Sequence, residues 1–176
     1  YGKANNWAEE SLKKFSELDD EEGVAAVLSF FDILLELALP GQSGDNEVLS
    51  ANYNVSDFGG FGRAYTVAGP QNWINYTSFD FWFYGTGSGL TYQAEISDNR
   101  SDPDSDTSER FDYQFVDDTA GWKYVSIPFA DFTRSTDFQP PGAPDDGFTL
   151  TEIWAWAIIL PVDADTIAVD DVGLGL

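Results

Sequence analysis

The segment Ser78-Phe79-Asp80-Phe81-Trp82-Phe83-Tyr84 is dominated by aromatic side chains and contains no glycine or proline. Aromatic and β-branched residues are enriched in β-strands because they pack well on a pleated surface. Similar short segments follow one another through the rest of the chain, separated by residues typical of turns. We expect strands at Val48–Val55, Gly62–Val67, Ser78–Tyr84, Leu90–Ser97, Glu109–Phe115, Trp122–Ile127, Leu150–Leu160 and Thr166–Leu174.

Short strands without helical crossovers between them are typical of two packed antiparallel sheets. The sequence therefore predicts an all-β protein, a jelly-roll β-sandwich over residues 40–176. The glycine-rich segment Gly85-Thr86-Gly87-Ser88-Gly89 joins two expected strands, which favours a hairpin turn over a phosphate-binding loop.

Residues 1–39 differ from the rest of the chain. Apolar residues recur there at spacings of three to five, as in Trp7, Leu12, Phe15 and Leu18, which predicts a largely helical N-terminal segment. The turn-forming stretch 40–46 then ends this segment. Beyond Glu17 both helix and strand remain open.

The charge and the missing residue types exclude several functions. Eight Lys and Arg oppose 31 Asp and Glu, a formal net charge of −23, so nucleic acid and anionic membranes are not expected partners. The chain has no Cys, Met or His, which removes thiol and imidazole catalysis. Paired carboxylates are the minimum for glycoside hydrolysis, but nothing marks one pair among so many. No apolar run is long enough to insert into a membrane. We expect no enzymatic activity.

Two loops are candidate functional segments. The first contains five acidic residues and is either a solvated hairpin loop or a site for calcium or a polar ligand; they are Asp98, Asp102, Asp104, Asp106 and Glu109. The second runs from Asp131 to Gly147 and is stiffened by three prolines. Long rigid loops on a β scaffold often carry function.

The second loop belongs to a recognisable stretch. Residues 122–142 resemble the family 11 carbohydrate-binding modules. The resemblance runs from Trp122-Lys123-Tyr124 through Ile127-Pro128-Phe129 to Asp137-Phe138-Gln139-Pro140-Pro141-Gly142. The final segment Ile167–Leu174 is similar to the last strand of that family, and Leu18–Val24 is similar to its opening. The resemblance implies a galactose-binding-like jelly roll with structural calcium and a concave sheet that holds β-glucan chains.

The resemblance also implies site residues. Asp137 matches a ligand-contacting Asp, and Phe138 lies where the family has a stacking Tyr. Ser135 lies where an Arg is expected, with Arg134 as its candidate replacement. Thr107 lies where an Asp is expected, with Asp106 beside it.

Trp154 occupies a further contact position in the family pattern. It shares one face of its expected strand with Trp156, Ile158 and Leu160, because side chains alternate along a strand. Two interpretations stay open: an exposed platform for a sugar ring, or a face covered by another element such as the N-terminal segment.

Calcium is the one expected cofactor. Asp170 or Asp171 would bind it together with Asp20 or Glu22, and the alternative is an ordinary acidic strand end.

The expected function is non-catalytic binding of β-glucan, as a module of a secreted or cell-surface system that degrades polysaccharides, with a catalytic glycosidase domain as a partner. The alternative is a structural domain that braces a glycosidase or mediates oligomerisation without binding sugar.

Overall fold

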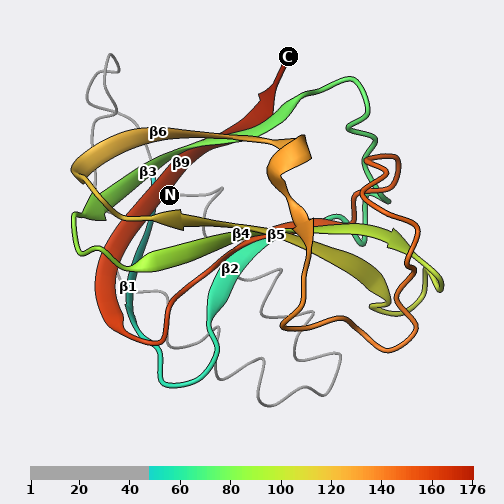
Figure 1. The fold of residues 1–176 in the computed structure, drawn as a ribbon, viewed down its shortest axis with the longest axis horizontal. Coiled ribbons are helices and arrows are strands. Elements are labelled where there is room, and N and C mark those ends of the chain that lie inside the picture. Colours follow the sequence, from blue (N-terminus) through green and yellow to red (C-terminus); the bar gives the residue numbers. More distant parts are fainter. Residues whose placement is uncertain (1–47) are drawn as a thin grey trace.

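The computed structural model describes residues 48–176. The helical segment expected over residues 1–39 lies outside the described residues. The described strands are β1 (Leu49–Asn54), β2 (Gly60–Ala64), β3 (Ser78–Thr86), β4 (Thr91–Arg100), β5 (Ser108–Val116), β6 (Ala120–Pro128), β7 (Thr133–Arg134), β8 (Ala155–Ile159) and β9 (Ala164–Gly175). A short 3-10 turn, η1 (Phe129–Asp131), separates β6 from β7 (Figure 1).

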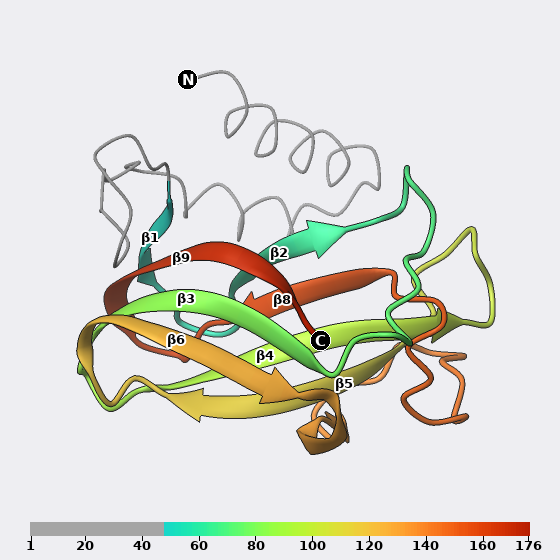
Figure 2. The ribbon, with the colours of Figure 1, turned by 90° about the horizontal axis from the view of Figure 1, so that it is seen from above.

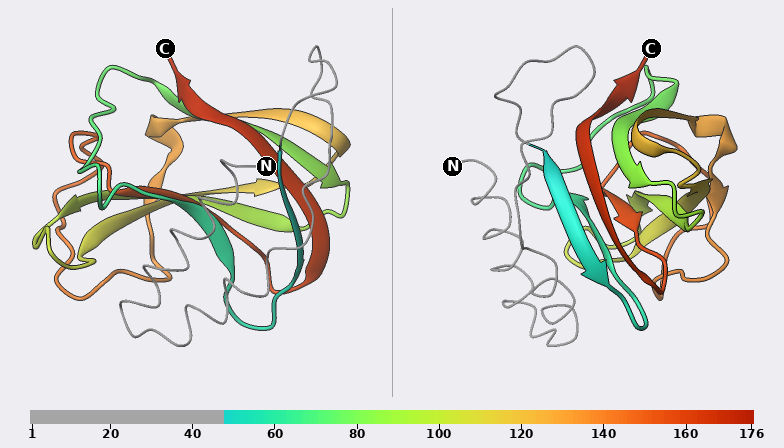
Figure 3. Two further views of the ribbon diagram at one scale, coloured as in Figure 1. Left: turned by 180° about the vertical axis from the view of Figure 1, so that it is seen from behind. Right: turned by 90° about the vertical axis from the view of Figure 1, so that its left-hand side faces the viewer.

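The strands form two antiparallel sheets. One has the order β1-β9-β3-β6 and the other the order β2-β8-β4-β5-β7. The sheets lie as two layers when the molecule is seen from above (Figure 2). Strand β9 is long and curved and runs between β1 and β3 (Figure 3). The predicted all-β jelly-roll sandwich is confirmed.

The core lies between the two layers, and alternate residues of β3 lie within it. Phe79, Phe81 and Phe83 point inward and are fully buried, against Tyr92 of β4 and Phe115 of β5. Burying each such side chain stabilises the fold by roughly 1.5–3 kcal/mol. The aromatic segment that predicted the fold is therefore the centre of the core.

Two sequence expectations are wrong in detail, and one short strand was missed. The strand expected over Leu150–Leu160 is confined to Ala155–Ile159: Leu150 has a left-handed backbone (φ 61°), and Ile153 forms only an isolated bridge with Gln71. The two-residue strand β7 was not expected, since so short a strand has no periodicity to detect. The segment Gly85–Gly89 is not a hairpin turn, because β3 and β4 belong to different sheets and it crosses between them.

Strand β2 approaches β8 closely at Gly62. A Cβ atom added there would lie 2.0 Å from the carbonyl oxygen of Trp156, which is backbone and cannot rotate away. We predict that Gly62→Ala lowers the free energy of unfolding by about 2 kcal/mol through overpacking. Urea denaturation measures this change.

The control is Gly173→Ala in β9, where the nearest atom to an added Cβ is 3.8 Å away. It should change stability by less than about 0.5 kcal/mol. Equal losses in the two variants would contradict a specific β2–β8 clash.

Candidate functional site

The outer face of the five-stranded sheet carries a row of polar side chains. On β4, Gln93, Glu95 and Ser97 alternate with the buried Tyr92, Ala94 and Ile96, so they point away from the core. Each faces a polar partner across the register of β5: Gln114, Asp112 and Arg110, respectively. We call these six residues the polar row. At about 3.3 Å per residue it runs for about 13 Å along β4.

Beside the polar row, the same face is lined by small residues. Ala155 and Ala157 of β8 point outward, since Trp156 and Ile158 point into the core. Their register partners on β2 are Ala64 and Gly62, and Gly60 continues the line opposite Ile159. This strip of small side chains lets a ligand approach the backbone next to the hydrogen-bonding groups.

Arg110 organises one end of the polar row. Its guanidinium donates to Ser97 Oγ at 2.5 Å and to Asp106 Oδ2 at 2.6 Å, and its Nε lies 3.5 Å from Glu95 Oε1. Burial raises the pKa of the Glu95 carboxyl and the facing Asp112 adds to the rise, while Arg110 opposes it. The cation thus holds acceptor oxygens in fixed positions while part of Asp106 remains exposed.

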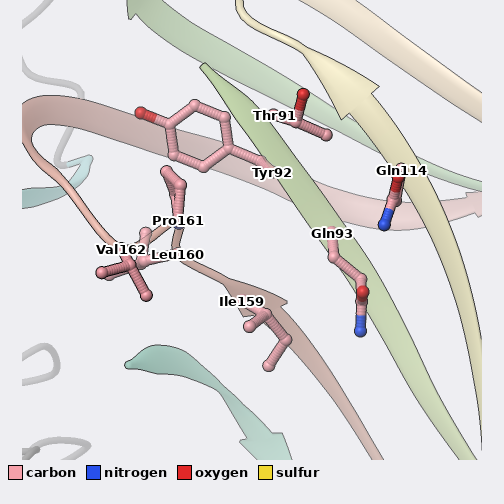
Figure 4. Close-up of a pocket in the computed structure, with 8 residues that line it drawn as sticks. All are labelled: Thr91, Tyr92, Gln93, Gln114, Ile159, Leu160, Pro161 and Val162. Atoms are coloured by element: carbon pink, nitrogen blue, oxygen red, sulfur yellow. The ribbon is translucent and has the colours of Figure 1, made fainter. Parts of the chain in front are cut away.

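The other end of the row opens into a pocket of about 240 Å³. Figure 4 shows the amide side chains of Gln93 and Gln114 on neighbouring strands, with Ile159 at the end of β8 and Leu160 and Val162 in the loop that follows it. Amides next to apolar carbons suit a ligand that presents both hydroxyl and C–H groups.

The turn with Asp137 and Phe138 lies beside the Arg110 end of the row. Gln139 fixes it there: the Arg110 N–H donates to Gln139 Oε1 at 3.0 Å, and Gln139 Nε2 donates to the Arg110 carbonyl at 2.8 Å. Phe138 is 59% exposed and Asp137 is exposed as well. The structure therefore brings three of the expected carbohydrate-contacting residues, Asp106, Asp137 and Phe138, to one end of β5.

Arg134 does not join them. It lies opposite the core residue Phe111, and its guanidinium pairs with the fully buried carboxylate of Glu109 and donates to the Pro144 carbonyl at 3.1 Å. Burial raises the pKa of Glu109, and Arg134 opposes this rise. The expectation that Arg134 replaces a sugar-contacting Arg is corrected: this arginine neutralises a buried acid.

Trp154 is a second correction. Trp154 and Trp156 are each 7% exposed, and Trp156 packs against Phe79 of the opposite sheet with ring centroids 5.7 Å apart. The guanidinium of Arg100 lies 4.3 Å from the Trp154 ring centroid and covers it. A stacking platform requires an open ring face. The covered-face interpretation holds, and for Trp156 the opposite sheet supplies the cover.

The carboxylates of the acidic loop point in different directions. Asp98 and Glu109 are buried, Asp102 accepts from the Asp104 N–H and the Ser105 hydroxyl within the loop, and Asp106 pairs with Arg110. Asp98 accepts the Thr149 N–H at 2.5 Å and so attaches β4 to the segment before β8. Such scattered oxygens do not form a calcium site.

The other expected calcium ligands are only partly described. Asp20 and Glu22 lie outside the described residues. Asp170 and Asp171 are adjacent in β9, and the Asp171 N–H donates to Asp170 Oδ1 at 2.8 Å. Within residues 48–176 no group of three or more acidic side chains could hold a metal ion. Calcium binding therefore stays a prediction.

Gln93, Glu95, Asp112 and Gln114 were not among the expected site residues. Their signal was present in the sequence, since polar residues alternate with Tyr92, Ala94 and Ile96. Alternation shows that one face is polar, but many solvent-facing strands share that pattern.

No helix of the described part of the chain is long and apolar enough to cross a membrane.

Two antiparallel sheets, one with an outer face of acids, amides and small side chains, define a β-sandwich binding module. The model of the family described as carbohydrate binding domain (family 11) matches residues 31–175, and the chain belongs to this family. It is a non-catalytic carbohydrate-binding module. No curated protein matches the sequence.

Solved structures share the fold at low sequence identity. A family 11 carbohydrate-binding module from Clostridium thermocellum, in complex with a beta-1,3-1,4-mixed-linked tetrasaccharide, has a TM-score of 0.63 at 19% identity, covering 84% of this chain and 94% of that one. The module of the cellulosomal cellulase Lic26A-Cel5E from the same organism has a TM-score of 0.62 at 19% identity, covering 76% and 78%. The family 30 module of the C. thermocellum cellulase Cel9D-Cel44B has a TM-score of 0.57 at 12% identity, covering 82% and 84%.

Proposed function

We propose that the chain binds a β-glucan chain, of the mixed-linkage or cello-oligosaccharide kind, along the outer face of the five-stranded sheet. The observation that carries this proposal is the polar row beside the strip of small side chains. A glucan chain presents hydroxyl groups along its edges. Carboxylates accept hydrogen bonds from these hydroxyls, and amides both donate to them and accept from them. The small residues of β2 and β8 leave room for its rings.

The two ends of the polar row would have different roles. At one end, the exposed ring of Phe138 offers a stacking surface for the apolar C–H face of a sugar ring, with Asp137 and Asp106 beside it as acceptors. At the other end, Gln93 and Gln114 offer amide groups within the pocket. Each hydrogen bond between protein and sugar replaces hydrogen bonds that both groups made to water. The net gain is therefore only about 0.5–1.5 kcal/mol per bond, and the affinity stays modest.

The same proposal covers the setting of the module. We propose that it works outside the cell or at the cell surface, next to a catalytic glycosidase domain whose substrate it holds. Family membership supports this, and the net charge of −23 is no obstacle, because β-glucans are uncharged. The structural calcium of the family is part of the proposal, with Asp170 or Asp171 as one donor.

Titration calorimetry with barley mixed-linkage glucan, laminarin and cellohexaose tests the proposal. We predict that Asp112→Asn and Phe138→Ala each weaken the affinity for the best ligand by about 3–10-fold. These factors correspond to the loss of one charged acceptor or one stacking ring. Neither side chain holds the core together, so the melting temperature should change little.

Ile74→Ala is the matched control for Phe138→Ala. Ile74 is an equally exposed apolar residue in the loop before β3. Its replacement should leave the affinity unchanged. Absence of binding to all three glucans by the parent chain would contradict the proposal and favour the domain that braces a glycosidase.

A further inference from the structure

The outer face of the other sheet carries a cluster of aromatic rings. Trp82 and Tyr84 of β3 alternate with the core phenylalanines and so point outward. In the antiparallel register Trp82 lies opposite Tyr124 of β6, and Tyr84 lies opposite Trp122. We call these four residues the aromatic quartet.

The rings of the quartet contact one another in two cross-strand pairs. The centroids of Trp82 and Tyr124 are 5.3 Å apart with an interplanar angle of 61°, and those of Tyr84 and Trp122 are 5.4 Å apart at 72°. Edge-to-face contacts of this kind hold rings in fixed positions. The quartet is therefore a preorganised surface, and ordering it on binding would cost little conformational entropy.

The quartet is partly open to solvent, and two of its rings, Trp122 and Tyr124, lie on β6 at the edge of the described sheet. Tyr124 is 51% exposed, and the other three rings are partly exposed. Among the described strands, β6 pairs within its sheet with β3 alone. The core is already filled by Phe79, Phe81 and Phe83, so the fold does not require four more large rings on the outside. Contiguous exposed aromatic surface commonly marks a binding site.

Polar groups lie beside the rings. Asp80 is 9% exposed, and its Oδ1 has no hydrogen-bond partner among the described residues. Partial desolvation and the neighbouring Asp80 carboxylate both raise the pKa of the Tyr124 hydroxyl, which places that acid next to the quartet. Ser78 and Asp80 lie over Gly175 of β9, where an added Cβ would be 2.2 Å from Ser78 Oγ and 2.5 Å from Asp80 Oδ2. Glycine at this position thus leaves room for the Ser78 and Asp80 side chains themselves, which pack over the β9 backbone beside the aromatic surface.

We propose that the aromatic quartet is a second carbohydrate-binding surface, which takes an uncharged β-glucan chain with sugar rings stacked on Tyr124 and Trp82 and hydroxyl groups directed to Asp80. Rings next to a carboxylate suit a ligand with apolar C–H faces and hydroxyl edges, whereas a purely apolar partner would leave the buried Oδ1 of Asp80 without a hydrogen bond. An acidic protein partner is disfavoured by the net charge of −23. This inference rests on the carbohydrate binding of the chain but uses none of the residues of the polar row.

The two surfaces lie on opposite faces of the sandwich. A single straight chain cannot contact both, so each module would hold two separate glucan chains and cross-link them. On a bundled polysaccharide the second contact would be intramolecular and would raise the overall affinity without strengthening either site.

Titration calorimetry with cellohexaose and mixed-linkage oligosaccharides tests the second surface, using the chain with Asp112→Asn and Phe138→Ala combined. We predict that this double variant keeps residual binding, and that adding Tyr124→Ala weakens the residual affinity at least threefold. Tyr124→Phe is the matched control, since it keeps the ring and should keep the binding. The stoichiometry of the parent chain should approach two oligosaccharides per module.

The outcomes separate the two proposals. Loss of all binding in the double variant, with the parent stoichiometry at one, would overturn the second surface and leave the first intact. Residual binding that Tyr124→Ala does not change would also overturn it, as would self-association that Tyr124→Ala abolishes in sedimentation velocity runs without sugar. No binding by any variant or by the parent would overturn both proposals.

Discussion

Replacing Trp156 by alanine is expected to lower the free energy of unfolding by about 3–5 kcal/mol, because it empties a large volume in the core. Trp156 is 7% exposed and packs against Phe79, which belongs to the opposite sheet. The cavity would therefore lie at the contact between the two layers. Urea denaturation followed by circular dichroism measures the change.

A second substitution at Trp156, with both stability and glucan affinity measured, distinguishes a core residue from a sugar-binding platform. Trp156→Phe keeps an aromatic ring in the core, so it should fold and bind glucans with the affinity of the parent chain. Tyr124→Ala is the matched control for stability, because it removes an aromatic side chain that is half exposed, and it should cost no more than about 1 kcal/mol. A Trp156→Phe variant that is as stable as the parent but binds glucan tenfold more weakly would contradict the assignment to the core.

Arg134→Ala is expected to destabilise the fold by about 3 kcal/mol. The variant leaves the carboxylate of Glu109 fully buried without its cation, and breaking a buried pair on one side is costly. The arginine itself is partly exposed, which keeps the expected loss at the lower end for such pairs. Glucan affinity of the folded variant should stay within about twofold of the parent, because Arg134 lies on the inner side of its sheet.

The pH dependence of this loss identifies its cause. Burial already raises the pKa of Glu109 while Arg134 opposes the rise, so removing the arginine raises that pKa further. A carboxyl whose pKa is higher in the folded than in the unfolded state stabilises the fold when protonated, and this contribution is lost as the pH rises. The deficit of Arg134→Ala should therefore be larger at pH 8 than at pH 5.

The double variant Glu109→Gln with Arg134→Ala is the control. It removes the buried charge together with its partner and should recover part of the lost stability. A deficit that is the same at pH 5 and pH 8, and that the second substitution does not reduce, would show that Arg134 acts through packing alone.

The sequence by itself determined the layers of this protein. The aromatic segment at Ser78–Tyr84 and the spacing of the other strands predicted the sandwich, because strand formation and turns depend on local residue types. The stretch Trp122–Gly142 predicted the family, and Asp137 and Phe138 within it do lie in an exposed turn.

Tertiary structure decided which side chains of each strand are covered and which lie on an outer face. Alternation separates the two faces of β8, but both Trp154 and Trp156 suit either a core or an exposed platform, and only the position of the second sheet and of Arg100 shows that they are covered. The role of Arg134 depends on a contact with Glu109, a residue 25 positions away in the chain. The polar row and the aromatic quartet likewise exist only through strand pairing, because side chains distant in sequence become neighbours when their strands are hydrogen-bonded in register.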